Sequence, residues 1–233
     1  MTDRRGFNEA VEELTHSHER NTSLCQPFVR ALSVDAASVC TLGAPFGSET
    51  MSASTSLAAT FDELQFDLGE KPSWDAMTTR RPVLVDDLHS VRNSPWPALQ
   101  KATQSIDIRS VYAFPLTMGS LDIGAVSLVS QRPETLPSSQ IKDAEILAQI
   151  AASQVLRRSL ASRTLNTNLE DNEGYSRRVV HQATGMVLAQ LNLSAADALL
   201  IIHGHAFSRG RTVRDVAADV VTRRLDFSSL IES

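Results

Sequence analysis

The chain has 233 residues, of which 42% are hydrophobic, and it carries a formal net charge of −5 at neutral pH. Its length exceeds the usual domain size of about 100 to 150 residues, so we expect one medium domain and one small one. No segment approaches the roughly 18 consecutive apolar residues of a membrane span, and the N-terminal residues lack the apolar run of a secretory signal. These features exclude a membrane-spanning protein and predict a cytoplasmic one.

Charge and cysteine content narrow the classes of site that the chain can hold. Cys25 and Cys40 share no spacing typical of a disulfide framework or a zinc site, so we expect two buried, unpaired thiols. Residues 174–225 hold seven arginines against three aspartates, a net charge of +4, so the rest of the chain carries −9. We expect any polyanion to bind the C-terminal end.

Hydrophobic periodicity and turn residues predict the elements of the first 140 residues. An amphipathic helix over 7–32 should be kinked or broken by Pro27. Strand-like segments follow at 34–42 and 51–60, and short helices at 61–68 and 74–79. A buried strand that ends in acidic residues is predicted at 82–88, a third helix at 98–105, and a strongly marked hairpin at 110–118 with 123–130.

A long helix is predicted from Ile141 to about Leu169, and its first half is apolar nearly all round. A helix that lies on one core needs only one apolar face, so the second face requires a second partner. The simplest partner is the same helix in another subunit, which predicts a homodimer. The alternative is that both faces are covered within one chain.

The order of elements predicts an α+β domain with helices covering an antiparallel sheet. The segments Leu68-Gly-Glu-Lys-Pro-Ser-Trp-Asp-Ala, Pro82-Val-Leu-Val-Asp-Asp-Leu and Val111-Tyr-Ala-Phe-Pro-Leu, followed by Ile123-Gly-Ala-Val-Ser-Leu, make residues 7–160 resemble a GAF domain. This resemblance implies a sheet of about six strands with a small-molecule pocket on the face away from the terminal helices. It leaves open whether the domain senses an unidentified ligand or serves dimerisation alone. Candidate pocket residues are Trp74, Asp86, Asp87 and Trp96.

The acidic pair Asp86-Asp87 has a competing interpretation, because such a pair also opens a response-regulator receiver domain. A receiver would need a phosphoacceptor aspartate some way downstream and a later lysine, and no lysine follows Lys142. We therefore interpret these carboxylates as caps of the following loop.

Three short helices are predicted in the last sixty residues. The first spans 175–191, the second starts at the capping sequence Ser194-Ala-Ala-Asp197 and ends at Gly210, and the third starts at Thr212-Val-Arg-Asp215. Their apolar positions recur at helical spacing, with Met186 and Ala195 among the expected core residues. They predict a small all-α bundle, joined to the α+β domain by a helical connector over 161–174.

The bundle resembles an ANTAR domain, an RNA-binding antitermination module. The resemblance rests on Val180-His-Gln-Ala-Thr-Gly-Met-Val-Leu-Ala-Gln-Leu, on His205-Ala-Phe, and on Thr212-Val-Arg-Asp-Val-Ala-Ala-Asp-Val-Val, and it covers residues 175–227. It implies binding of paired RNA hairpins in nascent transcripts. The sequence departs from many members at Thr184, where they have lysine, and near His203-Gly204, where they often show arginine.

Basic and polar side chains of the bundle are the candidate RNA contacts, because cations meet phosphates and polar groups read unpaired bases. These candidates are Arg177, Arg178, His181, Gln182, Thr184, Gly185, Arg209, Arg211 and Arg214. For Gly185, we favour a role in close helix packing over RNA approach.

Two other functions compete with RNA binding. Three small helices can also form a DNA-binding helix-turn-helix, so a DNA-binding regulator with a sensory GAF domain is the main alternative. An enzyme ranks last, because the sequence holds no nucleophile–base constellation, metal cluster or phosphate-cradling glycine loop. We therefore expect a non-enzymatic regulator that needs no cofactor.

Overall fold

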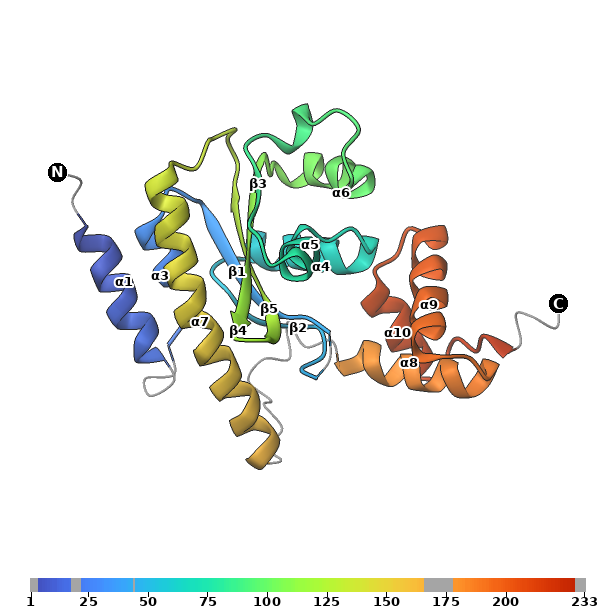
Figure 1. The fold of residues 1–233 in the computed structure, drawn as a ribbon. Helices are drawn as coiled ribbons and strands as arrows, with labels where there is room; N and C mark the ends of the chain where they lie inside the picture. Colours follow the sequence, from blue (N-terminus) through green and yellow to red (C-terminus); the bar gives the residue numbers. More distant parts are fainter. Residues whose placement is uncertain (1–3, 18–21, 44, 166–177, 229–233) are drawn as a thin grey trace. The chain divides into compact units, whose positions relative to one another are not determined.

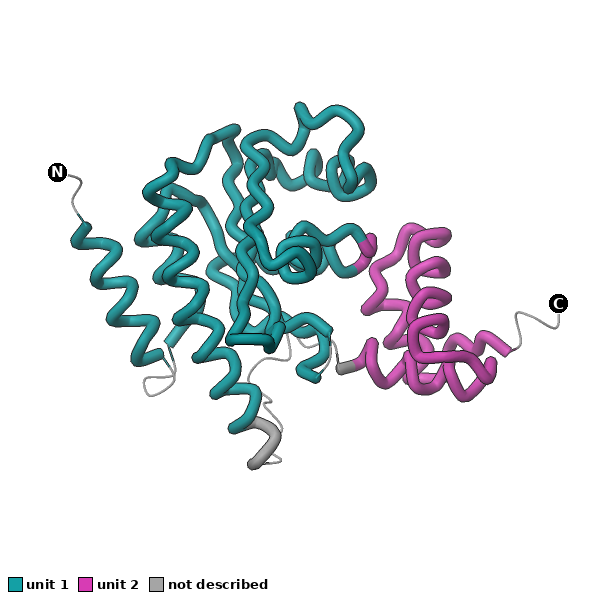
Figure 2. Tube along the Cα trace, in the orientation of Figure 1, with its two compact units in different colours: residues 1–66, 70–175 teal, residues 67–69, 176–233 magenta. Residues whose placement is uncertain are grey.

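The computed structural model describes residues 4–17, 22–43, 45–165 and 178–228. The chain divides into two compact units (Figure 2), one of residues 1–66 with 70–175 and one of residues 67–69 with 176–233. The first unit contains the α+β domain and the second contains the three-helix bundle. Residues 166–177, which include most of the predicted connector, lie outside the described part of the chain.

An antiparallel five-stranded sheet forms the centre of the first unit (Figure 1), in the order β2-β1-β5-β4-β3. The strands are β1 Ala36–Thr41, β2 Glu49–Ala53, β3 Val83–Val85, β4 Ser110–Met118 and β5 Leu121–Ser130. The predicted hairpin is confirmed: β4 and β5 pair from Ser110 opposite Ser130 to Met118 opposite Leu121. The described residues thus give five strands, where the family resemblance implied about six.

One face of the sheet is covered by the terminal helices α1 Arg5–Thr15, α3 Gln26–Ala31 and α7 Ser138–Leu165 (Figure 1). The predicted helix 7–32 is broken, and Pro27 lies in the first turn of α3, where a missing N–H and a fixed φ are tolerated. Buried Phe28, Tyr112 and Phe114 belong to the core between these helices and the sheet. Cys25 and Cys40 are buried and form no disulfide bond with each other, and burial raises the pKa of Cys25 to about 12.

The opposite face is covered by α4 Ser56–Leu68 and α5 Pro72–Thr79. The prediction of a strand over 51–60 is therefore wrong in its second half. The hydroxyl of Thr55 accepts a hydrogen bond from the Ala58 amide at 3.3 Å, which caps the first turn of α4 and ends the extended segment.

The predicted buried strand over 82–88 is an edge strand. β3 pairs with β4 alone, and the side chain of Leu84 is 42% exposed. Its apolar sequence is typical of a buried strand, but an edge position exposes one side of it. The chain continues through the 3-10 helix η1 Leu88–Ser90, α6 Pro97–Ala102 and the 3-10 helix η2 Thr103–Ile106.

The second unit is a bundle of α8 Arg178–Leu191, α9 Ala195–Arg209 and α10 Val213–Val221. The predicted caps are confirmed: the hydroxyls of Ser194 and Thr212 accept hydrogen bonds from the amides of Asp197 and Asp215, and Gly210 ends α9 at φ 61°. Ala195 is exposed and Met186 is half-buried, so neither is a full core residue as predicted. The buried apolar residues of the bundle are Val180, Ala183, Val187, Ala198, Ile202, Ala206, Val213, Val216, Ala217, Val220 and Phe227.

Candidate nucleic-acid interface and sensory-domain pocket

The outward side of α8 presents His181, Gln182 and Gly185 to solvent, which we call the α8 polar face. The buried residues Val180, Ala183 and Val187 occupy the opposite side of the helix. This division follows from the helical period, because residues three and four apart share a face. The α8 polar face therefore presents the imidazole of His181, the side-chain amide of Gln182 and the exposed backbone at Gly185.

Thr184, which was predicted to contact RNA, does not belong to the exposed α8 polar face. Its side chain is 8% exposed, and its hydroxyl donates a 2.7 Å hydrogen bond to the carbonyl of Val180 one turn earlier. The hydroxyl is therefore engaged by its own helix and cannot reach a base edge. Helical spacing alone did not predict this, since a small polar residue is compatible with either side of a helix.

Gly185 lies away from any close helix contact in the described bundle. We expected it to permit close helix packing, but a Cβ atom placed there would meet no atom within 4 Å, and the residue is exposed. Glycine is thus not needed for space within the described bundle. Its effect is to leave the backbone of α8 uncovered at the centre of the α8 polar face.

Two predicted contacts lie at the margin of the described structure. Arg177 falls outside the described residues, and Arg178 is described only as the first residue of α8. Both remain predictions based on the sequence.

The turn between α9 and α10 brings Arg209 and Arg211 together, and we call them the turn arginines. Both are exposed, whereas Arg214 in the first turn of α10 is half-buried. Arg211 pairs with Asp219 at 2.7 Å, and Arg224 approaches the same carboxylate at 3.2 Å. One carboxylate is shared by two guanidinium groups, so positive charge remains at this end of the bundle.

The turn arginines also act on the nearby imidazole of His205. Burial lowers the pKa of His205, and repulsion from Arg209 and Arg211 lowers it further. Cations at a helix C-terminus also complement the helix dipole, which favours their position after α9. The turn arginines therefore present exposed guanidinium groups to an anion such as a phosphate.

The residues predicted to line a ligand pocket have other contacts in the first unit. Asp87 accepts two hydrogen bonds from the guanidinium of Arg109, at 2.9 and 2.6 Å, and one from the His89 amide at 3.2 Å. Asp86 accepts a 2.7 Å hydrogen bond from the hydroxyl of Thr135. The interpretation of the acidic pair as loop caps is confirmed for Asp87, which caps η1.

The two tryptophans pack against α5 and its neighbours. The indole N–H of Trp96 donates a 2.9 Å hydrogen bond to Asp75, and the Trp96 ring is buried. Trp74 packs against the buried side chains of Cys40 and Met77. These contacts assign both rings to the packing of the domain.

We expect Asp87→Asn to lower the free energy of unfolding of the first unit by about 1 kcal/mol at pH 7, because it removes a partly exposed ion pair and keeps the capping oxygen. Hydrogen bonds from Arg109 hold the pKa of Asp87 below its usual value. The stabilisation is therefore present above the unfolded-state pKa and disappears as the pH falls through the lower, folded-state pKa. Urea unfolding followed by tryptophan fluorescence should show the two proteins converging in acid. Asp86→Asn is the control and should change stability less; a constant difference down to pH 2 would contradict the prediction.

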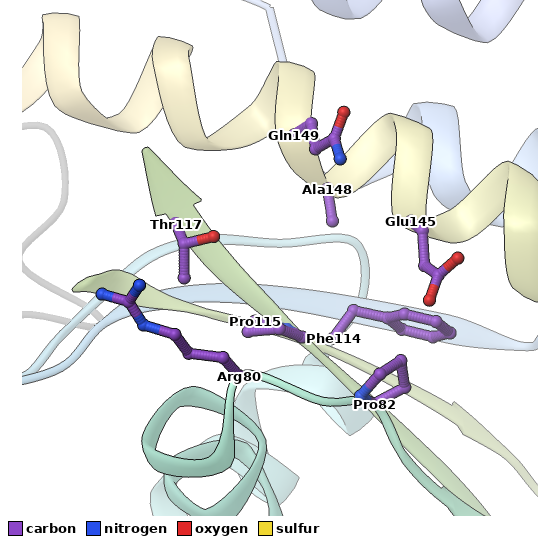
Figure 3. Close-up of a pocket in the computed structure, with 8 residues that line it drawn as sticks. All are labelled: Arg80, Pro82, Phe114, Pro115, Thr117, Glu145, Ala148 and Gln149. Atoms are coloured by element: carbon purple, nitrogen blue, oxygen red, sulfur yellow. The ribbon is translucent and has the colours of Figure 1, made fainter. Parts of the chain in front are cut away.

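A cavity of about 290 Å³ lies between α7 and the β3–β4 edge of the sheet (Figure 3). Figure 3 shows α7 side chains facing the side chains of β4 and of the segment that leads into β3. Its lining residues are Arg80, Pro82, Phe114, Pro115, Thr117, Glu145, Ala148 and Gln149. The four predicted pocket residues are not among them, and the cavity lies on the face of the terminal helices, opposite to the expected face.

Buried polar side chains on the expected face form hydrogen bonds within the domain. The amide of Gln65 on α4 donates a hydrogen bond to the Ser127 hydroxyl at 3.4 Å and accepts one from the Ser73 amide at 3.1 Å. Asp62, also on α4, accepts a hydrogen bond from the buried Thr50 hydroxyl. Sequence reasoning missed this polar layer because Gln65 and Asp62 have no local pattern that marks them as buried.

The described residues contain no group of three or more histidine, cysteine or carboxylate side chains that could hold a metal ion. In the same residues no single helix is long and apolar enough to cross a membrane; only Val179–Leu191 and Ala195–Arg209 taken together, across a 105° bend, have the required length and composition.

Comparisons with known proteins agree with this division into units. The family model described as GAF domain matches residues 22–155, and the one described as ANTAR domain matches residues 174–221. A search of curated proteins gave no match.

Solved structures support the fold of the first unit. The GAF domain of the cyanobacteriochrome TePixJ is 16% identical, with a TM-score of 0.50, over 65% of this chain and 95% of that one. The GAF domain of a phosphoenolpyruvate-protein phosphotransferase from Coxiella burnetii is 13% identical, with a TM-score of 0.50, over 71% and 99%. The chain spans 63% of the chromophore-binding domain of a bacteriophytochrome from R. palustris, at 12% identity over 66% of this chain and a TM-score of 0.46.

The GAF match covers more than half of the chain and coincides with the five-stranded sheet and its helices. The ANTAR match coincides with the three-helix bundle. A GAF domain indicates a sensory role, and an ANTAR domain indicates an RNA-binding antitermination regulator. The chain belongs to the GAF domain family, and an ANTAR domain follows its GAF domain.

Proposed function

We propose that the protein is a transcription antitermination regulator that binds hairpins in nascent transcripts and is controlled by its GAF domain. The observation that carries the proposal is the ANTAR bundle, whose helix α8 exposes His181, Gln182 and Gly185 while its α9–α10 turn exposes Arg209 and Arg211. Polar groups suit unpaired loop bases, and arginines suit phosphates. Such a function requires no catalysis, so we expect a regulator that is not an enzyme. We expect it to act in the cytoplasm, where transcripts are made.

Control by the GAF domain is proposed to act through α7. The cavity between α7 and the sheet uses Glu145, Ala148 and Gln149 of this helix. α7 is also the element from which the chain continues toward the ANTAR domain. A small molecule in the cavity, or a second subunit against α7, would therefore act on the helix that leads to the RNA-binding unit.

We expect the protein to be a homodimer through α7. Ile146 and Leu160 remain 43% and 51% exposed, so the described chain does not cover all apolar side chains of this helix. They lie on one side of α7 together with half-buried Ile150, at a spacing typical of a helix–helix seam. A dimer would also present two ANTAR domains to paired hairpins and raise the effective concentration of the second.

The change Ile146→Glu with Leu160→Glu should convert the dimer to a monomer, because two carboxylates per chain would be buried without partners. Sedimentation at micromolar concentration measures the state. The control Gln104→Glu with Gln131→Glu adds the same charge at exposed sites away from α7 and should leave the dimer intact. A monomeric unmodified protein would refute the assignment.

The function is tested by titrating the full-length protein against a tandem-hairpin RNA and a matched duplex DNA at several salt concentrations. We expect tighter binding to RNA at every salt concentration, with a shallower salt dependence than purely electrostatic binding would give. Tighter binding to duplex DNA would favour the DNA-binding regulator instead. No binding to either nucleic acid would refute the proposal.

A further inference from the structure

One side of α9 exposes two large apolar side chains that the bundle does not cover. Phe207 is 75% exposed and Leu200 is 69% exposed, the two highest values among the large hydrophobic residues of the described chain. They are seven residues apart, which places them on the same side of the helix two turns apart. Gly204 lies between them, and a Cβ atom there would meet no atom within 4 Å. The phenyl ring therefore lies beside a stretch of helix backbone that no side chain covers.

The fold does not use the ring of Phe207. Its neighbours in sequence do the packing: Ala206 is buried, and His205 stacks edge-on against Phe227 at 5.3 Å between ring centroids and an interplanar angle of 84°. An exposed phenylalanine contributes nothing to the core and leaves apolar surface in water, which costs free energy. The exposed ring is therefore accessible to a partner outside the bundle.

Positive charge surrounds the end of the helix that carries the ring. Arg209 is two residues further on and exposed, and Arg211 follows the C-cap Gly210. Asp219 pairs with Arg211 and is also approached by Arg224, so one carboxylate faces two guanidinium groups. The exposed ring and the exposed turn arginines lie within five residues of one another in the sequence, from Phe207 to Arg211. Aromatic rings and cations are the groups that bind single-stranded nucleic acid, because a base stacks on a ring and the phosphates meet the cations.

We propose that Phe207 is a stacking platform for an unpaired base of the RNA loop, with the turn arginines holding the phosphates on either side of that base. The proposal rests on the proposed function and deepens it, because it names the residue that meets a base. Stacking is tolerant of base identity, since every base has a π-face. Phe207 should therefore contribute affinity for an unpaired loop, while the choice among bases belongs to polar groups elsewhere.

A second copy of the chain is a weaker candidate for this surface. One ring and one aliphatic side chain separated by bare backbone form a small patch, whereas a stable interface buries about 1,000 Å² or more. Both copies would also carry the exposed turn arginines, and like charges repel. RNA has the complementary charge.

The test measures binding of the full-length protein to a tandem-hairpin RNA and to the same RNA with abasic loop positions, which keep the phosphates and remove the bases. Phe207→Ala should weaken binding to the intact RNA by at least about fivefold, from the lower end of the stacking energy of a base on an aromatic ring. It should change binding to the abasic RNA by less than about twofold. Phe207→Trp should retain the affinity, and its added indole fluorescence should be quenched by the intact RNA and not by the abasic one.

Leu200→Ala is the matched control, because it removes an equally exposed apolar side chain from the same side of α9. It should leave RNA affinity within about twofold. Equal RNA binding by the unmodified protein and by Phe207→Ala overturns this inference and leaves the proposed function standing. Failure of the unmodified protein to bind RNA overturns both. Loss of self-association in both alanine variants, with RNA affinity unchanged, would assign the surface to a protein contact and also overturn the inference.

Discussion

Gly124→Ala should destabilise the GAF domain by about 3 kcal/mol or more, at the upper end of the range for overpacked cores. A Cβ atom at this position would lie 1.9 Å from the Cys40 carbonyl oxygen and 2.8 Å from Thr41 Cα. Both atoms belong to the backbone of β1, which pairs with β5 through Thr41 opposite Gly124. A backbone neighbour cannot rotate away, so the two strands must separate at the centre of the sheet.

Urea unfolding followed by tryptophan fluorescence measures this effect, because both tryptophans, Trp74 and Trp96, lie in the GAF domain. Gly185→Ala is the matched control: the same change in an exposed helical position without neighbours should leave the tryptophan transition unchanged. It should stabilise α8 by about 0.5 to 1 kcal/mol, since alanine favours a helix over glycine. An unchanged midpoint for Gly124→Ala would contradict the close approach of β1 and β5.

The pair change Arg209→Ala and Arg211→Ala should weaken binding of a tandem-hairpin RNA by about 100-fold or more at low salt, if each guanidinium contributes one charge-assisted contact to a phosphate. The slope of log K against log salt should become shallower by about 1.4 to 1.8, because two phosphates fewer release their counter-ions. Both side chains are exposed at the α9–α10 turn, so the fold should persist. Circular dichroism of the variant checks that it does.

Arg81→Ala with Arg92→Ala is the control for net charge. Both arginines are exposed in the GAF domain, and removing them lowers the total charge by the same amount. That variant should keep both the affinity and the salt slope. A loss of affinity equal to that of the turn variant would show that overall charge, and not the α9–α10 turn, governs RNA binding.

The position of a ligand pocket in the sensory domain stays a prediction. The resemblance implied a pocket on the face away from the terminal helices, where Gln65 and Asp62 of α4 form buried hydrogen bonds. A cavity also lies under α7, beside Pro82 and Phe114. Whether space remains on a sheet face depends on side-chain volumes from several elements, and the order of those elements does not specify them.

The sequence by itself determined the features that arise from neighbouring residues. The caps Ser194 and Thr212, the stop at Gly210 and the β4–β5 hairpin follow from side chains that bond or turn the adjacent backbone. Sequence motifs likewise predicted that a GAF domain is followed by an ANTAR domain.

Only the tertiary structure decided which side of an element is covered. It placed β3 at the edge of the sheet and directed the Thr184 hydroxyl toward the backbone of its own helix. It also left Gly185 without close neighbours and the ring of Phe207 exposed. The physical reason is that burial depends on contacts between residues distant in sequence. A local pattern predicts that a face exists, and the packing of other elements determines whether water reaches it.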